Sequence, residues 1–277
     1  MNSLIRYKGG KGYLIQDIEH YYRMSGCRML VEVFGGSGKI SLNIRAQRNV
    51  YNDLDDDIFN LFQVVKERPK ALQKAFERHL PTDSKMYFGY MKESKPRTKV
   101  DRAYRTFMLF NMSFGGGGEH YGPMYSDKLP LFKTAEMKLN NIMELHAIIR
   151  NWTIEHTDFR DVIRKYDSPQ TFFYLDPPYW GFDWYNHNFE EQDFLDLKEL
   201  LDGMKGKYLM NINPSEEVRR IFGDPQADRR YSNSSMNTRG TEGARTVRSE
   251  WFYTNATRGT KIALDAFMEV QSRGDVK

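Results

Sequence analysis

The segment Asp176-Pro177-Pro178-Tyr179 has the residue types needed for chemistry on an exocyclic amino group. The Asp176 carboxylate and the Pro177 carbonyl can each accept one amino N–H, which favours a pyramidal nitrogen and frees its lone pair for attack. Proline fixes φ and keeps that carbonyl aimed, and Tyr179 offers a face on which an extruded base can stack. The segment therefore predicts a catalytic site that acts on a nucleobase. The structural alternative is a Pro-Pro turn that ends a strand beside a buried tyrosine.

Two earlier segments are suited to holding a nucleoside. The loop Phe34-Gly35-Gly36-Ser37-Gly38 follows an apolar segment, and its glycines allow the backbone to approach a ligand closely. It lacks the first glycine and the last Ser or Thr of a Walker loop, which argues against nucleotide hydrolysis. Asp53 follows the short segment 50–52, where a carboxylate can accept hydrogen bonds from ribose hydroxyls. Asp53 or Asp55 could instead cap the next helix, and the two uses are compatible.

The elements that would position these residues alternate between strands and helices. Apolar runs typical of strands buried on both faces occupy four segments: 29–34, 171–175, 208–212 and 250–254. Apolar residues recur with helical spacing over 13–24 and 55–66, and the glycine loop leads into a predicted helix over 39–47. This alternation predicts an α/β fold with a doubly wound parallel sheet. Open α/β sheets bind ligands at the carboxyl ends of their strands, where the glycine loop and Asp176 are expected.

The stretch 69–151 breaks this alternation. Helical patterns over 100–110 and 135–149 flank the glycine run 115–118, with no clear strand between them. Residues 66–105 contain twelve Lys and Arg but five Asp and Glu, which suggests a polyanion partner; solvated helix faces are the alternative. We interpret 69–151 as a mostly helical inserted domain, and 1–68 together with 152–277 as the catalytic domain.

The composition narrows the class of protein. The chain has 277 residues, of which 40% are hydrophobic and 28% charged, so it can form both a core and a solvated surface. Cys27 is the only cysteine, which excludes an internal disulfide and a thiolate metal cluster. No apolar run approaches the ~18 residues of a membrane span, and the first residues do not read as a secretory signal. We therefore expect a soluble, cytoplasmic protein with no metal and no membrane partner.

The order of these motifs resembles that of the Dam-like (alpha-group, D12 class) adenine-specific DNA methyltransferases over most of the chain. Tyr7-Lys8-Gly9-Gly10-Lys11 is similar to the family's aromatic-x-Gly-Gly-Lys segment, and His156-Thr157-Asp158-Phe159 to its Asp-Phe pair near the cofactor's adenine. The resemblance implies a Rossmann-like doubly wound methyltransferase sheet with a mostly helical inserted target-recognition domain. It places Lys11 near the methionine carboxylate of the cofactor S-adenosylmethionine. The cofactor-binding residues that it implies are Tyr7, Lys11, Phe34, Gly36, Gly38, Asp53, Asp158, Phe159 and Asp176.

The same resemblance implies methyl transfer to the N6 amino group of adenine in double-stranded DNA by base flipping, with Asp176, Pro177 and Tyr179 catalytic. Cytosine-N4 methylation and a non-catalytic DNA-binding relative are the alternatives. Such an enzyme can have a cognate restriction endonuclease as a partner, and the expected assembly is a monomer or a weak dimer. The DNA contacts are expected within the insertion, from Lys95, Arg97, Lys99, Arg102, Arg105, Ser113 and Phe114.

Two positions depart from the family pattern. Tyr7 stands where Trp is common, which keeps an aromatic ring there. The segment 110–114 replaces the frequent Asn-Arg-x-Ser-Phe, so an arginine expected near DNA is missing. The recognition sequence of better-known members therefore does not transfer to this chain.

Overall fold

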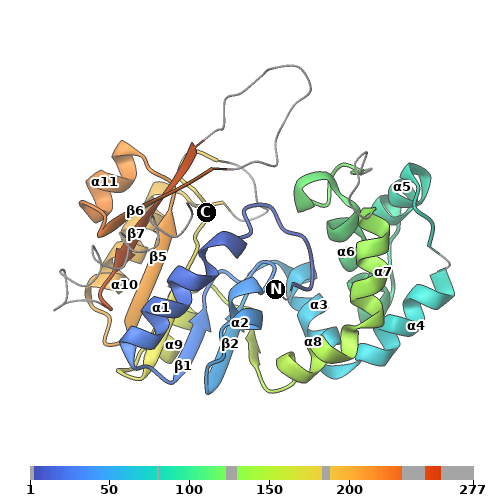
Figure 1. The fold of residues 1–277 in the computed structure, drawn as a ribbon, viewed down its shortest axis with the longest axis horizontal. Helices are drawn as coiled ribbons and strands as arrows, with labels where there is room; N and C mark the ends of the chain where they lie inside the picture. The colour runs from blue at the N-terminus through green and yellow to red at the C-terminus, as the bar shows by residue number, and fades with distance from the viewer. Residues whose placement is uncertain (1–2, 80, 123–129, 183–187, 233–246, 257–277) are drawn as a thin grey trace, which may run out of the picture.

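A seven-stranded sheet forms the left half of the molecule in Figure 1. The computed structural model describes residues 3–79, 81–122, 130–182, 188–232 and 247–256. The strands are β1 (Met29–Glu32), β2 (Arg48–Asn52), β3 (Thr153–Glu155), β4 (Thr171–Leu175), β5 (Lys207–Ile212), β6 (Ala227–Ser232) and β7 (Val247–Thr254). Their order across the sheet is β3-β2-β1-β4-β5-β7-β6. The carboxyl ends of β2, β1 and β4, which carry the candidate site residues, are therefore neighbours.

The direction of the strands changes across the sheet. The five strands from β3 to β5 run parallel, and β4 is buried along its whole length, as its apolar sequence predicts for a central strand. β7 pairs antiparallel with both β5 and β6, so the expectation of a wholly parallel sheet is wrong at this edge. β6 directly precedes β7 in the chain, and antiparallel neighbours do not need the crossover helix that parallel strands require.

Helices cover both faces of the sheet, which confirms the predicted doubly wound α/β fold. Phe172 and Tyr174 of β4 pack with α1 (Ile15–Ser25) and α2 (Lys39–Asn43). The alternate residues Phe173 and Leu175 face the opposite layer. That layer consists of α9 (Phe159–Tyr166), α10 (Glu191–Asp202) and α11 (Glu216–Phe222). The helix predicted over 39–47 ends at Asn43, because Ile44 is extended, with φ −100° and ψ 119°.

A bundle of helices forms the right half of Figure 1. It comprises α4 (Pro69–His79), α5 (Lys85–Glu93), α6 (Lys99–Met112), α7 (Leu131–Asn140) and α8 (Ile142–Ile149). The single helix predicted over 135–149 is thus two helices that meet at Asn141. α3 (Asp56–Glu67) packs against α6, so one apolar core runs from α3 into the bundle across the boundary expected at residue 68. Among the described helices none has the length and apolar composition needed to cross a membrane.

The segment that precedes α1 joins the two halves. Leu4 and Ile5 are fully buried in the core that α3 shares with the bundle. The Asn111 side chain of α6 accepts a hydrogen bond from the Arg6 backbone N–H and donates one to the Leu4 carbonyl, each at 3.3 Å. A Cβ on Gly116 would lie 2.7 Å from the Arg6 carbonyl carbon, so only glycine allows this approach. Residues 4–6 are therefore held by the bundle before the chain reaches the sheet.

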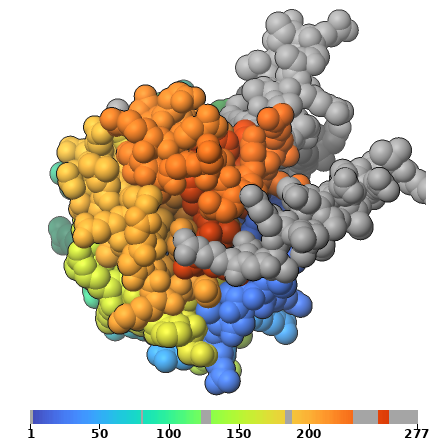
Figure 2. All heavy atoms as spheres, turned by 90° about the vertical axis from the view of Figure 1, so that its left-hand side faces the viewer, coloured from blue at the N-terminus to red at the C-terminus, as the bar shows by residue number. Residues whose placement is uncertain are grey.

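The opposite edge of the sheet is closed by the β6–β7 pair. Figure 2 looks onto this side, where atoms of residues 190–232 (orange tones) lie above those of α1 (blue), with β7 (red) visible between them. Arg229 of β6 pairs with Asp17 of α1 at 3.2 Å. This ion pair connects the edge strand to a helix that covers the sheet.

Candidate active site

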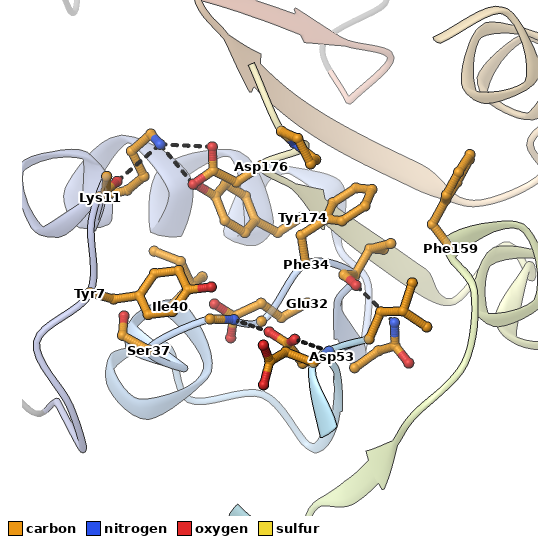
Figure 3. Close-up of a pocket in the computed structure, with 18 of the residues that line it drawn as sticks. Tyr7, Lys11, Glu32, Phe34, Ser37, Ile40, Asp53, Phe159, Tyr174 and Asp176 are labelled. Carbon is orange, nitrogen blue, oxygen red and sulfur yellow. Dashed lines mark hydrogen bonds and ion pairs between the residues drawn. The ribbon is translucent and has the colours of Figure 1, made fainter. Parts of the chain in front are cut away.

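A cavity of about 410 Å³ opens where the carboxyl ends of β1, β2 and β4 meet. Its wall is built from the segments 7–11, 32–37, 39–40, 52–55 and 157–159, together with Tyr174, Asp176, Pro178, Asn188, Phe189 and Asp193. Figure 3 shows Tyr7 and Lys11 on one side, Phe159 on the other, and Asp53 and Asp176 on separate edges. The structure thus brings together sequence motifs that are more than a hundred residues apart. The volume lies within the range typical of small-molecule and cofactor sites.

Asp53 is held at this cavity by the protein backbone. Its carboxylate accepts hydrogen bonds from the Gly36 N–H at 2.6 Å and the Asp55 N–H at 2.8 Å. Burial raises the pKa of Asp53 to about 6, although both N–H groups favour the charged form. Asp55 caps α3 by accepting from the N–H groups of Asp57 and Ile58. Helix capping, one of the two uses left open by the sequence, therefore belongs to Asp55, and Asp53 lines the cavity.

The glycine loop shapes the cavity at one position and packs at another. Gly36 has φ +50°, and a Cβ there would lie 2.9 Å from Cε1 of Tyr7, so the loop and the Tyr7 ring are in close contact. Gly38 has φ +64°, and its Cβ would lie 2.6 Å from Cζ of Phe62 on α3. Gly38 does not line the cavity. Its requirement for glycine comes from packing of the loop on α3.

Three phenylalanines form an apolar wall on the side of the cavity opposite Tyr7. The ring of Phe34 lies 5.9 Å from that of Phe159 and 5.5 Å from that of Phe189, and the last two rings are 5.0 Å apart. Asp158 caps α9 and pairs with Arg160 at 3.2 Å. Such a wall can hold a flat heteroaromatic ring. Sequence reasoning missed Phe189, which follows no recognised motif.

Asp176 and Lys11 form an ion pair at the end of β4. The Lys11 ammonium lies 2.7 Å from each carboxylate oxygen and also donates to the Gly9 carbonyl at 3.0 Å. The Asp176 side chain is 21% exposed and that of Lys11 only 5%. Burial raises the pKa of Asp176 to about 6, opposed by the Lys11 charge. Lys11, expected near a methionine carboxylate, here neutralises the candidate catalytic carboxylate.

A polar network beneath Asp176 fixes the tyrosine of the same motif. The Tyr179 hydroxyl donates to Glu250, with both carboxylate oxygens at 2.6 Å, and the Lys11 ammonium lies 4.8 Å from the Tyr179 ring centre. Asn211 of β5 donates to Asp176 at 3.0 Å and to Glu250 at 3.3 Å. Both Asn211 and Glu250 are buried. Sequence reasoning did not assign them a role. Asn211 interrupts an apolar strand run and Glu250 begins one, and a polar residue at such a position is the signal that could have identified them.

Glu32 is a further buried carboxylate that sequence reasoning missed. It lies at the end of β1, lines the cavity and accepts a hydrogen bond from the Ser41 N–H at 2.9 Å. Burial raises its pKa to about 7. It also interrupts an apolar strand run, so the same sequence signal applies.

The residues expected to contact DNA differ in their exposure and in their ion pairs. Lys95, Arg97 and Lys99 are exposed at the turn between α5 and α6. Arg102 and Arg105 instead approach Asp57 of α3, at 3.5 and 3.7 Å. The last two residues of this group, Ser113 and Phe114, also differ in exposure. Ser113 is fully buried and accepts a hydrogen bond from the Gly118 N–H at 2.8 Å, whereas Phe114 is 70% exposed.

Comparison with known proteins places this chain in a family. Residues 7–237 match the family of D12 class N6 adenine-specific DNA methyltransferases. The chain belongs to this family. Adenine-specific DNA methylation is therefore its activity, and cytosine-N4 methylation is not favoured. Like other members of the family, this D12 class methyltransferase requires a methyl donor.

Individual relatives are similar over much of the chain. The type II methyltransferase M1.LlaDCHI of Lactococcus lactis subsp. cremoris is 23% identical over 246 residues, which cover 79% of this chain and 83% of that protein. The DNA adenine methylase of Escherichia coli K12 is 26% identical over 187 residues, or 64% of each chain. The modification methylase StsI of Streptococcus sanguinis is 23% identical over 200 residues, which cover 65% of this chain and 29% of that protein.

Proposed function

We propose that this methyltransferase uses S-adenosylmethionine to methylate the N6 amino group of an adenine extruded from double-stranded DNA, with Asp176 as the proton acceptor. The observation that carries the proposal is the position of the Asp176 carboxylate. It lies at the end of β4, in the wall of the same cavity that Asp53, Gly36 and the phenylalanine wall enclose. A nucleoside-shaped cofactor and a reacting amino group can therefore meet there.

The residues of the cavity fit S-adenosylmethionine. The Asp53 carboxylate matches ribose hydroxyls, and the wall of Phe34 and Phe159 matches an adenine ring. Tyr7 and the loop backbone at Gly36 close the remaining side. The bound cofactor supplies a methyl group attached to a positively charged sulfur. The amino-acid end of the cofactor is assigned to the Lys11 side, where an ammonium group lies in the cavity wall.

Asp176 keeps capacity to accept a hydrogen bond from the substrate. A carboxylate has about four lone-pair positions. Lys11 occupies one on each oxygen, and Asn211 occupies a second on Oδ1. One position on Oδ2 is therefore left for an amino N–H of adenine, with the Pro177 carbonyl as the second acceptor. As the nitrogen gains its methyl group it loses one proton, which Asp176 can accept and release because its pKa is about 6.

Tyr179 is proposed as the stacking partner of the extruded adenine. Glu250 accepts the hydrogen bond of its hydroxyl, so the orientation of the ring is set before a base arrives. A ring held in this way does not lose rotational freedom on binding, which favours stacking.

The exposed Lys95, Arg97 and Lys99 are proposed to contact backbone phosphates of the duplex. Arg102 and Arg105 have less capacity for this role because Asp57 lies close to both. A cognate restriction endonuclease is proposed as a partner on the basis that the relative M1.LlaDCHI is named a type II methyltransferase. The assembly is proposed to be a monomer or a weak dimer.

The test is methyl transfer by the purified chain from labelled S-adenosylmethionine to duplex DNA, followed by nucleoside analysis. We expect labelled N6-methyladenine at a defined sequence. Labelled N4-methylcytosine would instead support the alternative chemistry. DNA binding without any transfer would identify a non-catalytic relative.

A further inference from the structure

A second cavity, of about 640 Å³, lies on the other side of Tyr7 from the phenylalanine wall. It shares Tyr7, Gly10, Ser37 and Lys39 with the candidate active site. Its remaining wall comes from the segment before α1, from Gly115 and from α7. Three basic residues line it, namely Arg6, Lys39 and Lys138, and we call it the basic cavity. It therefore lies between the sheet half and the bundle, beside the site of methyl transfer.

The described residues of the basic cavity carry positive charge and include no carboxylate that would balance it. None of its lining residues is Asp or Glu, and within the described part of the chain none of its three cations forms an ion pair. The Lys138 ammonium donates to the Asn111 side-chain carbonyl at 2.8 Å, and Arg6 to the Ser113 carbonyl at 3.2 Å. These neutral acceptors hold the side chains in place but do not neutralise them.

The arrangement is unfavourable in the free protein. Burial, together with repulsion from Lys39 and Arg6, lowers the pKa of Lys138 to about 7. Burial also lowers the pKa of Lys39 and of Arg6. The half-buried Arg102 and Arg105, by contrast, share the nearby carboxylate of Asp57. Three converging cations without such a carboxylate are what an anion-binding site requires, since the bound anion relieves their mutual repulsion.

We propose that the basic cavity binds a backbone phosphate of the DNA strand that carries the target adenine. The inference rests on the proposed function, because DNA is the polyanion that must approach the adjoining site. Each nucleotide of that strand brings one phosphate, and the two cavities share a wall at Tyr7, so an adenine in the first cavity places its own strand beside the second. The hydroxyl of Ser37 in the wall can donate a neutral hydrogen bond to a phosphate oxygen.

The first experiment compares two lysines of the same helix. Lys138→Met removes a cation of the basic cavity, and Lys133→Met removes an exposed one that pairs with Glu136. The salt dependence of duplex binding is measured for both. With Lys138→Met we expect weaker binding and a slope of log K against log salt that is smaller by about 0.9, the value for one lost phosphate contact. With Lys133→Met we expect an unchanged slope. An unchanged slope for Lys138→Met overturns the proposal.

The melting temperature of the DNA-free protein gives an independent test of the repulsion between the three cations. Lys138→Met removes one of three mutually repelling charges, so the variant should melt at the same temperature as the wild type or higher. If Lys138→Met binds DNA weakly because part of it is misfolded, it should melt at a lower temperature than the wild type. Its salt slope, calculated for the folded fraction, should then equal that of the wild type. This pair of results contradicts the proposal.

A last measurement separates DNA from a free anion as the occupant. Inorganic phosphate is titrated against the wild type and Lys138→Met, with melting temperature as the readout. The proposal is supported if phosphate weakly stabilises the wild type but not Lys138→Met, and if the salt slope of DNA binding is smaller for Lys138→Met. Stabilisation by phosphate with an unaltered DNA slope assigns the site to a free anion and overturns it. Methyl transfer by the wild type is scored separately, so failure of the proposed function is distinguishable from failure of this site.

Discussion

Asp53 and Asp176 occupy equivalent positions at the same sheet edge but are held in different ways. Each follows the carboxyl end of a parallel strand, and burial raises the pKa of each to about 6. Asp53 is bound by the backbone N–H groups of Gly36 and Asp55. Asp176 is bound by the side chains of Lys11 and Asn211.

The difference is consistent with the different roles that we propose for these two similar carboxylates. Backbone donors cannot leave without remodelling the loop, so Asp53 has a fixed position suited to binding. Side-chain donors can exchange partners by rotation, so Asp176 can take up a substrate proton and be restored. Burial and a raised pKa alone would identify both carboxylates as candidate functional residues without distinguishing their roles. The nature of the donors separates them.

The largest effect is expected from Asp176→Ala. The variant loses an acceptor for the amino N–H, so single-turnover methyl transfer at saturating cofactor should fall by ~10²–10⁴. Asp176→Asn keeps one acceptor oxygen and should lie between. Rapid-quench assays with labelled cofactor measure the rate, and circular dichroism checks the fold. A folded Asp176→Ala protein with the wild-type rate would remove the distinction between the two carboxylates.

Asp53→Ala should affect binding instead of the rate. Loss of hydrogen bonds to a charged group should weaken cofactor affinity by about 1.5–3 kcal/mol, measured by titration calorimetry. At saturating cofactor, the single-turnover rate should stay close to that of the wild type. A rate loss as large as that of Asp176→Ala under these conditions would show that the two residues share one duty.

The pH dependence should show both carboxylates, in different measurements. Asp176 is ionised above its pKa of about 6, so the rate at saturating cofactor should be full at neutral pH and fall as the pH drops through about 6. One unit lower, roughly a tenth should remain. Cofactor affinity should weaken over the same range, because Asp53 also titrates near 6. A rate that is constant down to pH 5 would contradict an ionised Asp176 as the acceptor.

The smallest effect is expected from Glu250→Gln. The Glu250 charge raises the pKa of Asp176, so its removal should shift the acid limb of the rate profile to lower pH. Gln can still accept the Tyr179 hydrogen bond, and the rate at neutral pH should fall by about fivefold, equivalent to roughly 1 kcal/mol. The exposed Glu217→Gln serves as the matched control. If the acid limb of the rate profile does not move, the Glu250 charge does not influence the pKa of Asp176.

Sequence patterns predicted the strands that bear the site because those strands are buried on both faces. β1 and β4 are near-continuous apolar runs, and the motifs follow them directly. β6 was missed because Ala227–Ser232 contains three consecutive charged residues, Asp228, Arg229 and Arg230, and charged side chains are common on edge strands. The predicted parallel direction of β7 was wrong because the direction of strand pairing depends on tertiary neighbours and not on local composition.

The charged residues show where sequence reasoning ends. A basic run predicts a polyanion partner, but only the fold reveals that Arg102 and Arg105 approach Asp57 of another helix. The opposite holds for Lys138, which is isolated in the sequence and joins Arg6 and Lys39 only in three dimensions. Pairing and clustering of charges are long-range properties, so composition cannot supply them.

The segment that links the two halves has a consequence for the order of folding. Leu4 and Arg6 bind Asn111, which is 105 to 107 residues later in the chain, and Lys11 binds Asp176, which is 165 residues later. During synthesis these early residues must wait until α6 and then β4 have left the ribosome, since contacts of such high sequence separation form only when both partners are present. The nascent chain can therefore form helices and strands well before the wall of the candidate active site is complete. The chain therefore becomes competent for methyl transfer in a late step, when the N-terminal segment with Lys11 packs against the end of β4 at Asp176.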